Sequence, residues 1–170
     1  MNPTAHIYRV GVIADTHIPA RGKTLPEAVL RLFDEEAVEL ILHAGDISSL
    51  AVINQLEAYA PVEAVQGNVE LPEVVRALPF KRELLVDRCA IGLIHDLGER
   101  KHYARNARRE FPSARVVVFG HSHVPMIEDH DGLLLVNPGS ATDRRRQPNC
   151  TVALLSITRG APSARLMALP

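Results

Sequence analysis

Short apolar runs alternate with amphipathic segments through the first half of the chain, and this alternation limits the folds open to it more than any other feature. Apolar runs at 7–14, 39–43 and 62–65 have the length of buried strands. Residues 26–37 lie between the first two and carry apolar side chains at helical spacing, and a second such segment precedes 62–65. Strands that alternate with helices predict a parallel sheet with right-handed crossovers.

The second half of the chain has a different pattern, with more strands than helices. The expected elements are a hairpin of 83–86 and 89–95, a helix at 99–111, a strand at 116–119, a hairpin of 124–127 and 133–136, and closing strands at 150–157 and 164–169. One small open sheet cannot hold all of these strands. We therefore expect an α/β fold with two sheets packed face to face and helices outside. A length of 170 residues predicts that 1–170 form a single domain.

Side chains that can bind a metal follow five of these apolar runs. They are Asp15, His17, Asp46, Asn68, His95, His121 and His123. Functional groups in open α/β sheets gather at the carboxyl ends of the strands, so these side chains are expected to meet. In extended backbone, residues two apart point to the same side, which predicts that Asp15 pairs with His17 and His121 with His123.

The donor set indicates which ions such a cluster would bind. It holds three oxygen-bearing side chains and four imidazoles but no sulfur, which suits Mn²⁺, Fe²⁺, Co²⁺, Ni²⁺ or Zn²⁺. Seven ligands suit two ions about 3.5–4 Å apart with a bridging carboxylate, the arrangement used for in-line displacement at phosphorus. Each piece alone also fits a turn residue or a structural histidine. Their joint occurrence at successive strand ends favours the metal site.

Composition excludes several other classes of function. The net charge of -1 and an aromatic content of 4% without Trp argue against nucleic-acid or anionic-membrane binding. No apolar run reaches the roughly 18 residues that span a bilayer, and the N-terminus lacks the pattern of a signal peptide. Cys89 and Cys150 lie in apolar stretches, which is typical of reduced core thiols. We therefore expect a cytoplasmic protein with no membrane partner.

Five sequence blocks resemble those of the calcineurin-like metallophosphoesterases. They are Asp15-Thr16-His17, Gly45-Asp46, Gly67-Asn68 with the later His95, Gly120-His121-Ser122-His123, and Asn137-Pro138-Gly139-Ser140. The short chain and the last block resemble the small phosphodiesterase branch often labelled YfcE-like. The resemblance covers nearly the whole chain. It implies a four-layer α/β/β/α sandwich of two mixed sheets flanked by helices, and a single metallophosphoesterase domain over 1–170.

The resemblance also implies a dinuclear metal centre with an assigned role for each ligand. Asp15, His17 and His123 would hold one ion, Asn68, His95 and His121 would hold the other, and Asp46 would bridge them. A hydroxide bridging the two ions would attack phosphorus in line, with Asp46, Asn68 and His95 as the catalytic residues. Manganese is the expected metal, with iron, nickel, cobalt and zinc as alternatives.

Two departures from the family pattern narrow the expected activity. Many members have a histidine after the block asparagine, where it helps protonate the leaving group or stabilise the transition state, but here the residue is Val69. Valine cannot transfer a proton, so we expect a preference for good leaving groups such as aryl phosphodiesters. Asp96 replaces the usual glycine after His95; we read it first as the start of a loop, although it could orient His95 or add negative charge near the second metal.

Other polar residues are weaker candidates for the site. For His43 we expect a supporting or structural role. We expect Arg144, Arg145 and Arg146 to form a solvated loop, with a clamp on substrate phosphate as the alternative. His6, His102 and His130 have no partner pattern, so we place them at the surface.

The leading hypothesis is a metal-dependent phosphodiesterase that acts on a small phosphorylated substrate. One alternative is a catalytically weak binding scaffold, as in the small retromer subunit that resembles this family. The other alternative is a nuclease, although near-neutral charge and few aromatic residues argue against nucleic acid. The physiological substrate, the native metal and any homo-oligomer stay open at this point.

Overall fold

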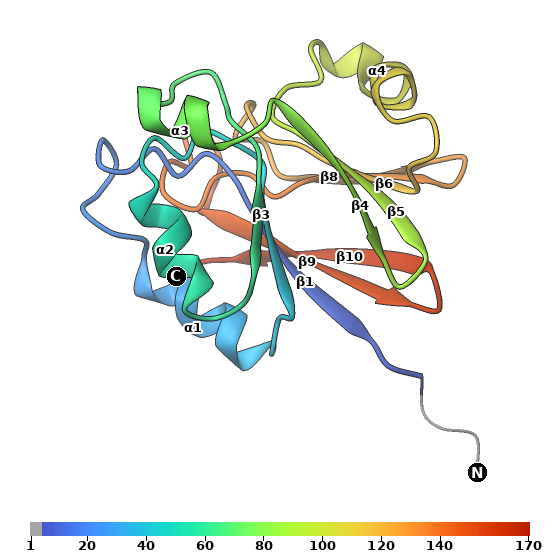
Figure 1. Cartoon of the computed structure of the whole chain (residues 1–170), viewed down its shortest axis with the longest axis horizontal. Coiled ribbons are helices and arrows are strands. Elements are labelled where there is room, and N and C mark those ends of the chain that lie inside the picture. The colour runs from blue at the N-terminus through green and yellow to red at the C-terminus, as the bar shows by residue number, and fades with distance from the viewer. Residues whose placement is uncertain (1–4) are drawn as a thin grey trace.

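The computed structural model describes residues 5–170; residues 1–4, part of the segment in which we expect no signal peptide, lie outside it. Its strands form two five-stranded sheets that face each other (Figure 1). The first sheet has the order β10-β9-β1-β2-β3. Its strands are β1 (Tyr8–Ile13), β2 (Leu40–His43), β3 (Val62–Ala64), β9 (Thr151–Thr158) and β10 (Ala161–Ala168). β1, β2 and β3 are parallel, as the alternating pattern predicts, while β9 and β10 are added antiparallel.

The second sheet has the order β4-β5-β6-β8-β7. Its strands are β4 (Lys81–Val86), β5 (Cys89–Ile94), β6 (Val116–Val118), β7 (Met126–His130) and β8 (Leu133–Asn137). β5, β6 and β8 run parallel, and two hairpins place β4 and β7 antiparallel at the edges. Both sheets are therefore mixed.

Helices cover the outer face of each sheet. α1 (Glu27–Glu35) and α2 (Ala51–Glu57) pack on the first sheet, and α4 (Tyr103–Glu110) lies against the second (Figure 1). A 3₁₀ turn, η1 (Arg100–His102), leads into α4, and α3 (Pro72–Ala77) lies between β3 and β4 in sequence.

Three buried clusters hold these layers together. The cluster between the sheets joins Val12 of β1 to Leu93 of β5, among others. Phe33 of α1 and Phe111, directly after α4, anchor the clusters beneath the helices. Burying a side chain of this size stabilises the fold by about 1.5–3 kcal/mol. The layers follow the order helix, sheet, sheet, helix, which confirms the predicted four-layer sandwich.

Most expected elements are present, with small differences at their ends. The helix expected at 99–111 starts with the 3₁₀ turn. β7 begins only after Pro125, which has no N–H to give to a neighbouring strand. β10 begins earlier than expected, at Ala161, because a tight turn at Arg159 and Gly160 pairs Ala161 directly with Thr158.

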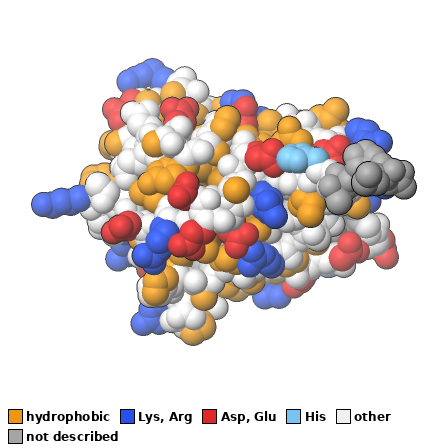
Figure 2. Space-filling model, turned by 90° about the horizontal axis from the view of Figure 1, so that it is seen from below, with side chains coloured by type: hydrophobic (Ala, Val, Ile, Leu, Met, Phe, Trp, Pro, Cys, Tyr) orange, Lys and Arg blue, Asp and Glu red, His pale blue; other side chains and the backbone are white. Residues whose placement is uncertain are grey.

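Three further observations concern membrane-spanning helices, the cysteines and the distribution of charged side chains. Within residues 5–170, no helix is long and apolar enough to cross a membrane. Cys89 is buried, Cys150 is partly buried, and both are free thiols, as expected. On the face drawn in Figure 2, acidic and basic side chains are interspersed among apolar ones and do not gather into a patch of one sign.

Candidate metal centre

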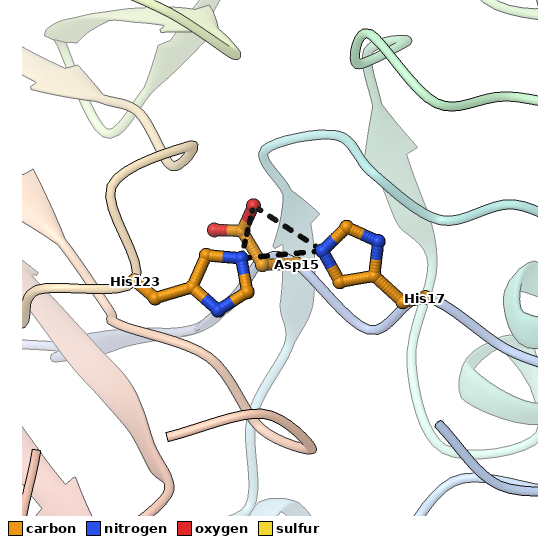
Figure 3. A group of neighbouring side chains, drawn as sticks. All are labelled: Asp15, His17 and His123. Carbon is orange, nitrogen blue, oxygen red and sulfur yellow. Dashed lines mark hydrogen bonds and ion pairs between the residues drawn. The ribbon is translucent and has the colours of Figure 1, made fainter. Parts of the chain in front are cut away.

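Asp15, His17 and His123 form a compact group at the end of β1. The Nε2 atoms of the two histidines face each other at 3.2 Å. Oδ1 of Asp15 lies 3.5 Å from His123 Nε2 and 4.0 Å from His17 Nε2. Figure 3 shows the carboxylate directed between the two imidazoles. All three residues offer ligand atoms within 4.8 Å of one another.

Asn68, His95 and His121 meet in a neighbouring group. Oδ1 of Asn68 lies 3.0 Å from His95 Nε2 and 3.2 Å from His121 Nδ1. The His95 and His121 rings are perpendicular, with centroids 5.2 Å apart. The loops that follow β3, β5 and β6 each supply one of these side chains.

Asp46 lies between the two groups and faces both. Its Oδ2 is 3.6 Å from His17 Nε2, and its Oδ1 is 3.4 Å from His95 Nε2. Asp15, Asp46 and His95 also offer ligand atoms within 4.8 Å of one another. The structure thus brings all seven predicted residues together, with one carboxylate oxygen of Asp46 directed toward each group.

The expectation from residue spacing was wrong in two respects. The prediction assumed extended backbone, whereas Asp15, His17, His121 and His123 have φ values of 53°, 47°, 69° and 59°, in the left-handed region. His121 and His123 also do not point to the same group. His123 joins Asp15 and His17, and His121 faces Asn68.

Asp46 also has a left-handed backbone, with φ of 53°, so five of the seven residues adopt this conformation. It costs free energy for any residue other than glycine. Such residues cluster at functional sites, where the surrounding fold holds them in place. The strain therefore supports a functional role for these loops.

The two carboxylates differ in their protonation. Asp15 is fully buried, and this burial raises its pKa to about 7. Burial alone would also raise the pKa of Asp46, but hydrogen bonding and charge from His95, with the Asn68 N–H, lower it to about 2. One carboxylate is thus held ionised while the other is costly to ionise without a nearby positive charge.

Two of the histidines, His17 and His123, are held in the neutral form that binds metals. Burial lowers the pKa of His17 and His123, which favours their neutral state. For His95, burial alone would lower the pKa, but Asp46 reverses the shift and raises it. His95 Nδ1 donates to the carbonyl of Ala44 at 2.8 Å, and His123 Nδ1 donates to the carbonyl of Asp143 at 2.7 Å. These bonds leave both Nε2 atoms free as ligands. The residues therefore fit a divalent ion of the predicted kind.

We expect the Asp15→Asn variant to be more stable than the parent protein after chelation of all metal, and more so at pH 8 than at pH 5. Folding raises the Asp15 pKa, so the native state holds a proton that the unfolded state has released between about pH 4 and 7. The contribution of Asp15 to stability therefore falls across that range, by on the order of 4 kcal/mol.

Urea unfolding at both pH values measures this difference. Asp34→Asn, which makes the same replacement on the exposed face of α1, serves as the control. An advantage for Asp15→Asn that is equal at the two pH values would contradict the expectation.

Glu70 fixes the loops that carry Asp46 and Asn68, a role that the sequence did not indicate. Its Oε1 accepts hydrogen bonds from Gly67 N at 2.7 Å and Ile47 N at 3.1 Å, and its Oε2 accepts one from Ser48 N at 2.6 Å. The backbone N–H groups of Asn68 and Val69 in turn donate to Asp46 Oδ1. The available signal was that Glu70 ends the block Gly67-Asn68-Val69-Glu70, at the position where the family pattern has Asp or Glu.

We expect Glu70→Gln to weaken Mn²⁺ binding by about 10–100-fold, because residues that position metal ligands commonly have effects of this size. The amide would turn an N–H group toward a backbone N–H in place of an accepting oxygen. Calorimetric titration of Mn²⁺ measures the change. Glu73→Gln, an exposed residue of α3, is the matched control. Equal affinity in Glu70→Gln and the parent would refute the positioning role.

Two further sets of buried polar contacts support the site. His43 is fully buried; its Nδ1 accepts from Gly45 N, so its Nε2–H donates to Thr16 Oγ1 at 3.1 Å. Burial lowers the pKa of His43 to about 3, which agrees with the structural role predicted for it. Ser140 Oγ donates to the Asp15 carbonyl at 2.7 Å, and Asn137 Nδ2 donates to the Gly120 carbonyl. The fifth sequence block thus holds two ligand loops in place.

Asp96 and the three consecutive arginines lie at the edge of the site. Asp96 Oδ1 accepts from Gly98 N at 2.7 Å, which is the expected loop start, and its Oδ2 lies 3.9 Å from His121 Nε2. Arg144, Arg145 and Arg146 are exposed, as predicted. The positive charge of Arg145 nevertheless contributes to lowering the pKa values of residues in the Asp15 group.

Comparison with known proteins relates this geometry to a family. The family model described as calcineurin-like phosphoesterase superfamily domain matches residues 8–160. A protein of Methanothermobacter thermautotrophicus named "Probable metallophosphoesterase" is 38% identical over 171 residues, covering 92% of this chain and 95% of its own. Phosphodiesterase MJ0936 of Methanocaldococcus jannaschii is 29% identical, covering 77% of this chain and 82% of its own.

The fold also matches that of solved structures. Vacuolar Protein Sorting 29 from Cryptosporidium parvum superposes with a TM-score of 0.78 at 20% identity, covering 95% of this chain and 97% of its own. At this identity the likeness concerns the fold alone.

Proposed function

Since the chain belongs to the calcineurin-like phosphoesterase superfamily, we propose that it is a metal-dependent phosphodiesterase with two divalent ions at the seven-residue site. The observation that carries this proposal is the position of Asp46, whose two carboxylate oxygens face different histidines in two neighbouring groups. A carboxylate in this position can bridge two ions, which is the arrangement used for displacement at phosphorus.

The residues divide between the two ions as the geometry groups them. Asp15, His17 and His123 would hold one ion, and Asn68, His95 and His121 the other, with Asp46 between them. Once bound, the ions would lower the pKa of a water molecule and neutralise charge that develops on the phosphoryl oxygens.

The chain's own contribution is to orient these ligands and limit their charge. The Ala44 and Asp143 carbonyls fix the ring orientations of His95 and His123. Asn68 supplies a neutral oxygen, so the centre stays positive enough to attract a phosphate anion. The donor set favours manganese in our proposal, and iron, nickel, cobalt or zinc would also fit it.

Val69 supports diesters with good leaving groups as the preferred substrates. It directly follows Asn68 and is 48% exposed beside the site, where an apolar side chain cannot donate a proton to a leaving oxygen. Aryl phosphodiesters need such help less than alkyl monoesters do, because their leaving groups are more acidic.

We expect Val69→His to raise hydrolysis of an alkyl phosphomonoester by at least about tenfold, since a positioned general acid contributes about 10²–10⁴-fold. Steady-state rates on glycerol phosphate measure the gain. Val75→His is the matched control, because Val75 is equally exposed, at 48%, on the nearby helix α3. Equal rates in the two variants would show that the missing histidine does not limit monoester hydrolysis.

Two alternative functions are weaker. A binding scaffold has no need of seven intact ligands, so their presence favours catalysis. A nuclease needs a basic surface for the nucleic-acid backbone, whereas the net charge of the chain is -1. We therefore propose a small phosphorylated substrate, and the free cysteines support a cytoplasmic location.

A substrate screen with Mn²⁺ tests the proposal. The panel comprises aryl phosphodiesters, cyclic nucleotides, nucleotides and single-stranded DNA. We expect aryl or cyclic diesters to be hydrolysed fastest. Hydrolysis of single-stranded DNA at a comparable rate would favour the nuclease, and no hydrolysis of any member would favour the scaffold.

A further inference from the structure

A cavity of about 230 Å³ lies beside the candidate metal centre, between the start of α4 and the second sheet. Tyr103 of α4, Phe119 after β6 and Met126 of β7 form its walls, and Arg100 and Val124 lie among its exposed lining residues. No role proposed for the seven metal-site residues involves this cavity.

The walls of the cavity are suited to an uncharged ring. The Tyr103 and Phe119 rings pack edge to face with centroids 4.8 Å apart, and the charge of Arg100, the one charged residue of the lining, is paired with that of Glu128. A dry apolar cavity of about 150 Å³ is enough to bind benzene, so this one has room for a substituted aromatic ring. Offset and edge-to-face contacts with aromatic walls would add to the apolar burial.

Three of the four polar residues in the walls, Asn137, Ser122 and Arg100, already have partners. Asn137 Nδ2 donates to the Gly120 carbonyl and to Ser122 Oγ, and Asn137 Oδ1 accepts from Gly139 N. Ser122 Oγ also accepts from Val124 N. Arg100 is paired with Glu128 at 2.9 Å. A ligand that depends on many hydrogen bonds would find few free partners, so the cavity favours binding by shape and stacking.

The cavity and the metal centre share one short loop. Ser122, which lines the cavity, lies between His121 and His123, which belong to the two groups of the centre. A substituent joined to phosphorus through one ester oxygen could therefore reach across this loop. Val124, which follows His123 in sequence, is an exposed residue of the cavity lining.

We propose that this cavity binds an aromatic ester group of the phosphodiester substrate. The proposal rests on the proposed function and deepens it by assigning a binding site to the aromatic ring of the substrate. Because the walls offer few free hydrogen-bonding groups, the site selects for an aromatic ring over an alkyl chain more strongly than for one ring over another.

Methyl NMR of methionine tests the proposal with a readout other than turnover. The chain has three methionines; Met126 lines the cavity, and Met167 lies on β10 in the other sheet. In zinc-loaded protein with ¹³C-methyl methionine, diphenyl phosphate should shift the Met126 signal through the ring current, and diethyl phosphate should not. Met167 should stay unchanged in both titrations. Equal Met126 shifts with the two esters, or none with either, would overturn the proposal.

A cavity-filling variant gives a second test. Val124→Trp should raise the KM for bis(4-nitrophenyl) phosphate about tenfold, the scale on which apolar pockets discriminate, with a smaller change in kcat. It should also abolish the Met126 shift. Val75→Trp, at a similarly exposed valine on α3, is the control and should change neither. An unchanged KM in folded, metal-loaded Val124→Trp would contradict the proposal.

The two tests separate this inference from the proposed function. Hydrolysis of aryl diesters without a Met126 shift would reject the cavity and leave the phosphodiesterase. A Met126 shift with diphenyl phosphate in a protein that hydrolyses no ester would support the cavity as a ring-binding site and reject the phosphodiesterase.

Discussion

Replacing Asp46 with asparagine is expected to lower phosphodiester hydrolysis by about a thousandfold or more. Stabilisation of transition-state charge by bound metal contributes several kcal/mol, and each 1.36 kcal/mol is a factor of ten in rate. Asparagine keeps an Oδ1 that can accept from the N–H groups of Asn68 and Val69. It loses the second anionic oxygen, which faces His17. The fold should therefore survive while the bridge between the two groups is lost.

Steady-state rates with bis(4-nitrophenyl) phosphate, together with metal content by mass spectrometry, check this expectation. Asp34→Asn removes the same charge from an exposed position on α1 and should have the parent's rate and metal content. Full activity in Asp46→Asn would mean that the centre does not work through a bridging carboxylate. A loss of activity with unfolding would be seen in the circular dichroism spectrum.

Gly67→Ala is expected to have the second-largest effect, lowering stability by about 3 kcal/mol and activity at least a hundredfold. A Cβ at this position would lie 2.1 Å from Asp46 Oδ1 and 2.2 Å from Asp46 N, far inside van der Waals contact. The loops carrying Asp46 and Asn68 would have to separate. A displacement of about 1 Å at a catalytic group can cost 10²-fold in rate.

Gly132→Ala is the control for this variant. Gly132 lies in the β7–β8 turn with φ of +82°, and a Cβ added there would have no neighbouring atom within 4 Å. This variant should lose only about 1 kcal/mol, the cost of a left-handed conformation, and keep its activity. Chemical unfolding and steady-state rates, measured on both variants, compare their losses of stability and activity. Activity in Gly67→Ala equal to that of Gly132→Ala would show that the close approach at Asp46 is not required.

The fold was largely predictable because its signals are local. Apolar runs of strand length and the helical spacing of residues such as Val29 and Phe33 determine the elements, and the excess of strands in the second half indicates a second sheet. The start of β10 was missed because it depends on the Arg159–Gly160 turn, whose pairing partner is the preceding strand. Such ends are decided by hydrogen bonding between strands.

The membership of the site was also predictable, whereas its internal geometry was not. Each of the seven residues follows an apolar run, and the carboxyl ends of β1, β2 and β3 in one sheet lie opposite those of β5 and β6 in the other. The direction of each side chain depends on left-handed backbone at residues such as Asp15 and His123, which sequence spacing does not reveal. Glu70 was missed for the same reason, since its three bonds go to backbone groups brought near only by the folded loops.

Anomalous scattering from crystals grown with manganese tests the dinuclear centre most directly. We expect two peaks, one among Asp15, His17 and His123 and the other among Asn68, His95 and His121, with Asp46 touching both. Metal analysis of the same protein should give two ions per chain. A protein that binds no metal at these seven residues when supplied with manganese would contradict the proposed centre and the function built on it.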